Sequence, residues 1–208
     1  MEHIFKNKVV KEIIEWVVCF LIAYVIYICI NYFLGTIAGI RQTSMFPTAK
    51  EGERVIVGRR ILYNHEVKRG QIVTISAPDN IAKDSSDVVA TYIKRDGFDW
   101  FTYNVLEIGK KSYIKRVIAV GGDTLKITED GRVVLNGELL EESYLPDGIT
   151  TPITGDYYDL KVPEGCVFVM GDNRAASRDS REFGVVPLDK VEGIVHIRVW
   201  PLNKIGEI

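Results

Sequence analysis

The sequence predicts a mainly β domain carried behind one N-terminal transmembrane helix. Two patterns predict it: an apolar stretch without charges near the N-terminus, and strand-like runs rich in β-branched and aromatic residues that recur after it. A third observation agrees, because no segment beyond the apolar stretch keeps a helical period with caps at its ends. A chain of 208 residues has room for one such domain and its anchor.

The apolar stretch, Trp16–Ile40, is long enough to cross a bilayer. Its first part, Trp16–Leu34, spans roughly 28 Å as a helix at about 1.5 Å per residue, which matches a hydrocarbon core of about 30 Å. We therefore expect a transmembrane anchor over 13–36. A cleaved signal peptide is the alternative, because "GTIAG" offers small residues spaced somewhat like a cleavage site. The apolar run exceeds the roughly 7 to 15 residues of a secretory apolar region, which favours an uncleaved anchor.

Basic residues flank the anchor on both sides and set its expected orientation. They are Lys6, Lys8 and Lys11 before it, and Arg41 and Lys50 after it. The positive-inside rule then slightly favours a cytoplasmic N-terminus over 1–12 and an extracytoplasmic domain over 37–208. The protein is thus expected in the cell membrane with a single pass, and the lipid bilayer is one of its partners.

Charge and cysteine content argue against a nucleic-acid-binding protein and against a domain stabilised by disulfides. With a net charge of −2 and no block of lysine or arginine, the chain has no basic face for nucleic acid. Cys19 and Cys29 lie in the apolar stretch and Cys166 lies in a strand-like run, so no disulfide is possible within the domain. We expect Cys166 to be a core residue. The residues give no indication of an oligomeric state.

Seven runs beyond the anchor are expected to form strands, because they are short, β-branched and bounded by turn residues. These runs are "RVIVG" 54–58, "QIVTISAP" 71–78, "YIKRVIAVGGD" 113–123, "TLKIT" 124–128, "RVVLNG" 132–137, "CVFVMGD" 166–172 and "IVHIRVWP" 194–201.

The segment Asp79–Lys111 fits the strand pattern less well, and we expect an insertion over 80–110. It begins polar and then holds Trp100, Phe101 and Tyr103 together. Such an aromatic cluster beside an anchor suits the lipid interface, and it equally suits local core.

The three histidines do not suggest catalysis or metal binding. His3 precedes the anchor, His65 lies in a polar stretch, and His196 alternates within a strand-like run. Cys/His spacing of the zinc kind and the G-x-S-x-G pattern are both absent, so we expect each histidine to be structural and no metal or cofactor to be needed.

A serine and a lysine offer a different mechanism. Ser44 stands in "QTSMFPTA", and a serine hydroxyl needs a base to take its proton. A lysine serves only if burial lowers its pKa, and Lys115 lies in the apolar run "SYIKRVIAVGG". Strand alternation would turn Lys115 inward and leave Arg116 outside. An edge-strand lysine in water remains the alternative, whereas Lys50 lies among charges and is expected to be solvated.

The loop "MGDNRAASRDSREFG", residues 170–184, is dense in ionisable side chains. A carboxylate near Lys115 would stabilise its ammonium and oppose catalysis. If the loop lines the site, Asp172 and Asp179 must therefore be paired with arginines, and the loop supplies Arg174, Arg178 and Arg181. Ser177 is then placed to hydrogen-bond the neutral amine and orient it.

Three motifs in this order behind an anchor closely resemble the bacterial type I signal peptidases. They are "SMFPT" 44–48, "YIKRVIAVGGD" 113–123 and "GDNRAASRDSREFG" 171–184, of which the last is the most specific. The resemblance covers about 12–202 and implies a β-rich catalytic domain with an apolar surface against the bilayer. It implies a serine endopeptidase that removes signal peptides with small residues at positions −3 and −1 from exported preproteins.

The resemblance also implies roles for single residues. Ser44 matches the nucleophile, Lys115 the general base and Ser177 the hydroxyl that positions the lysine, while Asp179 and Arg181 match a structural ion pair. Gln42 departs from the family pattern, because many members carry serine or another small residue at that position to help bind the oxyanion. Its longer side chain offers an amide as donor there, and the backbone N–H of Ser44 is the safer one.

Two other interpretations stay open from the sequence. A self-cleaving Ser-Lys repressor has a related catalytic core, although such proteins are soluble and carry a DNA-binding domain. A membrane-tethered β binding module would leave the serine and lysine without a role. Ser44 lies within about 35 Å of Leu34 even along an extended chain, so the anchor would hold it near a membrane-bound substrate.

Overall fold

The computed structural model describes residues 8–33, 35–59, 66–79 and 87–208. The α-helices are α1 Lys8–Phe33, α2 Gly97–Asn104 and α3 Ser180–Phe183, and the 3-10 turns are η2 Leu188–Lys190 and η3 Leu202–Lys204. The strands are β1 Gly35–Gly39, β2 Arg54–Arg59, β3 Ile72–Ser76, β4 Ser112–Val120, β5 Thr124–Ile127, β6 Val133–Leu135, β7 Glu138–Leu139, β8 Asp159–Lys161, β9 Cys166–Met170, β10 Val186–Pro187, β11 Val191–Trp200 and β12 Gly206–Glu207.

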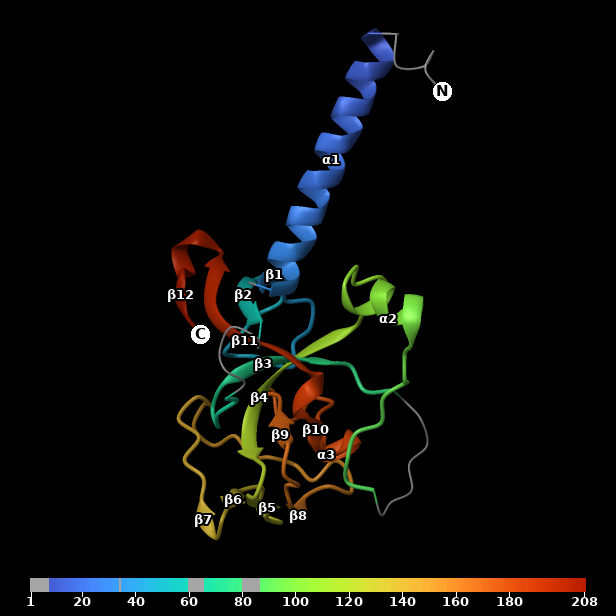
Figure 1. Cartoon of the computed structure of the whole chain (residues 1–208). Coiled ribbons are helices and arrows are strands. Elements are labelled where there is room, and N and C mark those ends of the chain that lie inside the picture. The colour runs from blue at the N-terminus through green and yellow to red at the C-terminus, as the bar shows by residue number, and fades with distance from the viewer. Residues whose placement is uncertain (1–7, 34, 60–65, 80–86) are drawn as a thin grey trace.

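Helix α1 projects away from a domain built of strands (Figure 1). Its segment Lys8–Asn31 contains a window of 18 residues with a mean hydropathy of 2.6, and none of that window is buried, so the helix is long and apolar enough to cross a membrane. The helix begins five residues before the expected anchor of 13–36 and ends three residues before the expected end at 36. The helix does not continue, because the residues "GTIAG" from Gly35 onward pair with β2 as a strand.

Gly35 makes this change of direction possible. Its φ is +139°, and a Cβ there would lie 2.4 Å from the Val57 carbonyl oxygen. Only glycine tolerates both conditions. A single residue therefore separates the end of the helix from the start of the sheet.

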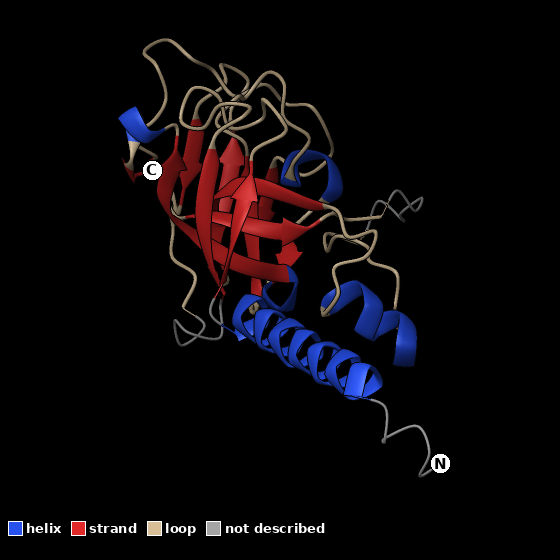
Figure 2. Cartoon of the chain, turned by 90° about the horizontal axis from the view of Figure 1, so that it is seen from above, coloured by secondary structure: helices blue, strands red, loops and turns tan. Residues whose placement is uncertain are grey.

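The strands form two antiparallel sheets (Figure 2). The larger has the order β1-β2-β11-β3-β4-β9-β10, with β12 paired to β11, and the smaller has the order β7-β6-β5-β8. This architecture confirms the mainly β prediction, and each of the seven predicted runs contains or overlaps a strand. The short strands β7, β8, β10 and β12 were not predicted, since two or three residues carry no clear alternation.

Three apolar clusters lie among the described residues of the domain. One lies where the smaller sheet packs on β4 and β9, with Ile118, Leu125 and Phe168 among its members. Cys166 belongs to this cluster, which confirms it as a core residue. Another contains Ile40, Met45, Val55 and Val195 and supports the chain just after β1.

Helices α2 and α3 are differences from the sequence prediction, which expected no helix after the anchor. Helix α2 lies within the segment expected as an insertion, between β3 and β4, and residues 80–86 of that segment lie outside the described part. None of the residues of α2 is buried, so Trp100 and Phe101 are not local core. Helices of eight and four residues are too short for a recognisable apolar period.

Candidate active site

Ser44 lies in a turn that follows β1, and the residue after it fixes that turn. The Met45 side chain is 1% exposed within the apolar cluster beneath the turn, and the Ala49 N–H donates to the Met45 carbonyl at 2.8 Å. Ser44 itself is 8% exposed. The burial of Met45 thus holds the serine at the surface of the core.

Lys115 lies at the centre of the larger sheet. Strand β4 pairs with β3 on one side and β9 on the other, with Lys115 opposite Val73. The lysine is 1% exposed, which excludes an edge-strand lysine in water. Burial lowers the pKa of Lys115 from 10.5 to about 8, while the carboxylate of Asp179 raises it and the guanidinium of Arg181 lowers it.

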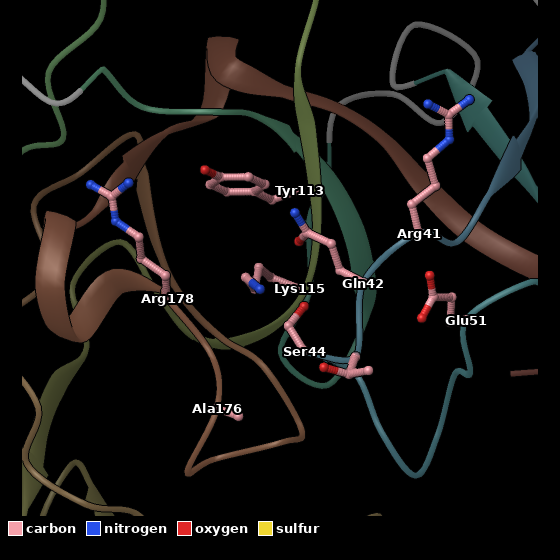
Figure 3. A pocket seen from close by; sticks show the side chains of 9 residues that line it. Arg41, Gln42, Ser44, Glu51, Tyr113, Lys115, Ala176 and Arg178 are labelled. Atoms are coloured by element: carbon pink, nitrogen blue, oxygen red, sulfur yellow. The ribbon is translucent and has the colours of Figure 1, made fainter.

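Ser44 and Lys115 line the same cavity of about 490 Å³. Figure 3 shows the Ser44 hydroxyl and the Lys115 amine pointing toward one another, with the Tyr113 ring above them and Arg178 on the far side. The Lys115 Nζ lies 5.6 Å from the centre of the Tyr113 ring. Tyr113 is a site residue that the sequence analysis did not select, although its position two residues before Lys115 on one strand places it on the same face.

Arg116 is buried rather than exposed, contrary to the expectation from alternation. It is 7% exposed, and its Nε and Nη2 donate to the two Asp172 carboxylate oxygens at 2.9 and 2.7 Å. Thr48 Oγ1 also donates to Asp172 Oδ2, at 2.6 Å. A second interior lies on that side of β4, so both faces of the strand are covered. Asp172 is therefore paired with Arg116 and not with an arginine of its own loop.

The loop after β9 contacts the backbone of the serine turn. The Asn173 N–H donates to the Ser44 carbonyl at 3.0 Å, and Asn173 Nδ2 donates to the Thr43 carbonyl at 3.2 Å. A Cβ on Gly171 would lie 2.3 Å from the Ser44 carbonyl oxygen and 2.2 Å from Ser177 Oγ. Gly171 thus permits a close approach of Ser44 and Ser177 that any side chain would prevent.

Asp179 and Arg181 form a bidentate ion pair that is fully buried. Arg181 Nε and Nη2 donate to the two Asp179 carboxylate oxygens at 2.8 Å each, and both side chains are 0% exposed. Asp179 also accepts the Gly171 N–H at 3.0 Å, and Arg181 donates to the Arg174 carbonyl at 2.9 Å. The pair therefore fixes both ends of the loop.

The other two arginines of the loop have partners of their own. Arg174 is 1% exposed and pairs with Glu142, at 3.0 Å between Nη1 and Oε2. Arg178 lies 3.7 Å from Glu182 and lines the cavity. Arg174 therefore joins the loop to the segment after β7, a contact that the sequence analysis did not foresee.

Ser177 is 6% exposed, and its hydroxyl makes no hydrogen bond with the described residues. The hydrogen bond to the lysine amine that the sequence analysis expected is thus not formed here. Its backbone carbonyl accepts from Arg181 Nη2 at 3.3 Å, so the residue is held in place while its hydroxyl stays available.

Gln42 lines the cavity beside Ser44, and its amide points into it between Tyr113 and Lys115 (Figure 3). A second cavity of about 480 Å³ continues from Ser44 between the chain at 39–45 and the chain at 110–114. The site thus opens into a groove bounded by two extended segments.

The remaining candidate residues do not enter the site. Lys50 is exposed, as expected. His196 lies on β11, while His3 and His65 lie outside the described residues. Within the described part of the chain, no three His, Cys, Asp or Glu side chains gather as metal ligands.

Known proteins resemble this chain over most of its length. A family model described as "Signal peptidase, peptidase S26" matches residues 13–200. Signal peptidase I of Bacillus licheniformis is 33% identical over 202 residues, which cover 94% of this chain and 92% of the relative. Signal peptidase I T of Bacillus subtilis (strain 168) is 30% identical over 208 residues, which cover 97% and 92%. A crystal structure of a signal peptidase I from Enterococcus faecalis V583 is 24% identical, with a TM-score of 0.40, over 62% of this chain and 96% of that one.

The family match and the relatives, which cover more than nine-tenths of this chain, agree with the resemblance of the three motifs. They favour an enzyme over a tethered binding module. The chain therefore belongs to the signal peptidase family, peptidase S26, and is a serine peptidase.

Proposed function

We propose that this enzyme removes N-terminal signal peptides from exported preproteins at the membrane surface, with Ser44 as nucleophile and Lys115 as general base. One observation carries the proposal: a lysine with its pKa lowered by burial to about 8 lies beside a serine hydroxyl in one cavity. An amine of that pKa is partly neutral near physiological pH and accepts a proton, which an ordinary lysine does not.

The reaction then proceeds in two halves. Ser44 Oγ attacks the scissile carbonyl while its proton passes to Lys115 Nζ, and a tetrahedral intermediate forms. The C–N bond breaks, Lys115 returns the proton to the leaving amine, and the mature protein departs with the signal peptide esterified to Ser44. Lys115 next takes a proton from water as the hydroxide attacks the ester, and it returns that proton to the Ser44 oxygen.

Two donors are available for the oxyanion. We assign the Ser44 N–H as the first and the Gln42 side-chain amide as the second, supported by the position of that amide in the cavity. Loss of one such donor typically costs about 3 to 4 kcal/mol of transition-state stabilisation. Gln42→Glu replaces the donor by an acceptor of the same length, so kcat should fall by about 10² to 10³-fold with little change in KM.

Ser177 is proposed as a positioning residue for Lys115. Support comes from its buried hydroxyl, which has no partner among the described residues and lies next to the Ser44 carbonyl across Gly171. A hydroxyl that accepts from the lysine ammonium and donates to its amine would orient Nζ through the proton transfers. The Asp179–Arg181 pair is proposed as the structural support of this hydroxyl.

The substrate is proposed to lie extended in the groove between 39–45 and 110–114. An extended chain suits a site with a backbone segment on either side, and its small −1 and −3 side chains would point into the domain. The apolar helix α1 makes the chain a membrane-anchored member of its family. We propose that its N-terminus is cytoplasmic and that the catalytic domain is on the other side.

The experiment that tests this function uses the full chain in detergent with a purified preprotein. Ser44→Ala and Lys115→Ala should each abolish removal of the signal peptide, and Lys50→Ala should not, because that lysine is solvated. Circular dichroism confirms that each variant is folded. Cleavage that survives Lys115→Ala in a folded protein would refute the lysine as base.

A further inference from the structure

Helix α2 leaves large aromatic side chains in solvent. Phe98 is 78% exposed, Trp100 44% and Phe101 42%, and no residue of the helix is buried. The rings of Phe98 and Phe101 stack on each other with 6.4 Å between their centres. A cluster of exposed aromatic residues on a short helix indicates an interaction surface, because folding alone gains little from it.

The polar contacts of α2 lie on a different set of residues. Arg95 pairs with Asp99 at 3.1 Å, and its guanidinium lies 3.9 Å from the centre of the Tyr103 ring. Arg95, Tyr103 and Trp100 line a cavity against the domain, whereas Phe98 and Phe101 do not. The helix is thus held by one set of side chains and presents the phenylalanine pair outward.

The position of α2 identifies what covers this pair. Figure 1 shows α2 at the height of the C-terminal end of α1, and the view from above in Figure 2 shows the two helices beside each other. Only one residue separates α1 from β1, so the domain begins where the apolar helix ends. An apolar group at that height beside a membrane-spanning helix meets the boundary between headgroups and acyl chains.

We propose that α2 is a second membrane contact of this protein, in which Phe98 and Phe101 insert into the lipid interface beside α1. Aromatic rings are favoured at that depth. Asp99 is the only residue of α2 that is charged at neutral pH, and it is already paired with Arg95. The contact is therefore apolar and does not depend on anionic lipid.

The test places a single tryptophan in α2 of the full-length protein in phosphatidylcholine proteoliposomes. Trp16→Phe and Trp200→Phe leave Trp100 as the reporter, and the lipid is brominated near the headgroup end of its acyl chains. In brominated lipid Trp100 should lose most of the emission that it has in unbrominated lipid. In unbrominated lipid its emission maximum should lie at a shorter wavelength than that of free tryptophan in buffer. Adding Phe98→Ser and Phe101→Ser should restore the emission.

The matched control reports on the opposite end of the molecule. Leu139 is 59% exposed and belongs to β7, the strand that Figure 1 shows far from α1. With all three native tryptophans changed to phenylalanine, Leu139→Trp should keep its emission in brominated lipid. Equal quenching at both sites, or quenching at neither, overturns the proposal. An α2 that instead packs against a second copy of the chain gives an unquenched Trp100.

A second readout links the contact to catalysis and rests on the proposed function. The Phe98→Ser, Phe101→Ser protein should cleave a short soluble peptide like the wild type, and it should cleave a membrane-inserted preprotein with a higher KM. Leu139→Ser should change neither. An enzyme that cleaves no preprotein refutes the proposed function and leaves the quenching result as an independent test of α2. If KM is unchanged while Trp100 is quenched, α2 contacts the membrane without helping the enzyme reach its preprotein. If Trp100 is not quenched, the membrane contact of α2 is refuted.

Discussion

At the scale of single residues, the site depends on how much free energy it costs to protonate one buried amine. Lys115 is almost completely buried, and its ammonium loses hydration that the nearby Asp179 only partly replaces. Asp179 is itself bound to Arg181, so the two charges largely cancel as seen from the lysine. The low pKa of Lys115 therefore follows from burial together with the pairing of the neighbouring carboxylate.

Activity should follow the titration of this amine. In the proposed mechanism the neutral form of Lys115 takes the serine proton, so kcat/KM should rise with pH through an apparent pKa of about 8. The measurement is a pH profile of cleavage of a soluble peptide by the full chain in detergent. A profile that is flat between pH 6 and about 9 would contradict the assignment of Lys115 as the base.

The same burial should make Lys115 destabilising. Its pKa is about 8 in the folded protein against an ordinary 10.5, so the unfolded chain binds more protons between these values and the free energy of unfolding rises with pH there. At pH 7 the cost is on the order of 3 kcal/mol. Lys115→Met should therefore raise the melting temperature at neutral pH while abolishing activity. Its advantage over the wild type should shrink as pH rises from about 8 toward 10.5.

Gly171→Ala tests the close approach of the serine turn to the loop. The new Cβ would meet the Ser44 carbonyl oxygen and Ser177 Oγ at distances that force one of them to move. A misplacement of about 1 Å at a reacting group costs on the order of 10²-fold in rate, so kcat should fall by about that factor. Gly206→Ala is the control, because a Cβ there meets nothing within 4 Å. Equal activity of both variants would show that the turn tolerates the displacement.

At the scale of elements, the loop between β9 and α3 links strand β4, which carries Lys115, to the turn that carries Ser44. Asp172 binds Arg116 of β4 and Thr48 of the serine turn, so one carboxylate connects both. Its removal would leave Arg116 buried without its counter-ion.

Asp172→Ala should destabilise the fold by about 3 to 5 kcal/mol and lower kcat, because an uncompensated charge remains in the interior. Thermal unfolding and peptide cleavage measure the two effects. Asp189→Ala provides the comparison, since the Asp189–Lys190 pair is solvent-exposed and such pairs contribute about 0 to 1 kcal/mol. A loss of stability no larger than that of Asp189→Ala would refute the role of the pair.

The larger strands were predictable at this scale, and several partners were not. The run containing Lys115 shows its strand in the sequence, but its alternation left both an inward lysine and a solvent-exposed edge lysine open, and only the structure shows the burial. Alternation failed for Arg116, because an alternating pattern assumes that one face of the sheet is exposed to solvent. The loop after β9 covers that face of β4 and buries Arg116. The Arg174–Glu142 contact joins residues 32 positions apart, and no local pattern reports such a pairing.

At the scale of the whole molecule, the anchor and the catalytic domain are joined without a linker. Helix α1 ends at Phe33 and β1 starts at Gly35, where strand pairing with β2 begins at once. The anchor was evident from the apolar run in the sequence. The abrupt turn into the sheet was not, because "GTIAG" continues the apolar composition and its pairing partner lies at residues 54–58.

Lengthening this junction should separate catalysis from access to membrane-bound substrate. Insertion of a flexible Gly-Ser segment between α1 and β1 should leave the cleavage of a soluble peptide unchanged, since both proposed catalytic residues lie in the domain. It should slow the cleavage of preprotein in proteoliposomes, because a longer tether lowers the effective concentration of the site at the bilayer. A preprotein rate that does not depend on tether length would contradict this prediction.

Under the proposed function at the membrane surface, the short junction at Gly35 also decides how the enzyme searches for its substrate. A catalytic domain that cannot rise from the surface shares a two-dimensional space with any preprotein still held by its apolar segment. Encounters are then set by the number of molecules per area of membrane and by lateral diffusion, and dilution of the surrounding fluid leaves them unchanged.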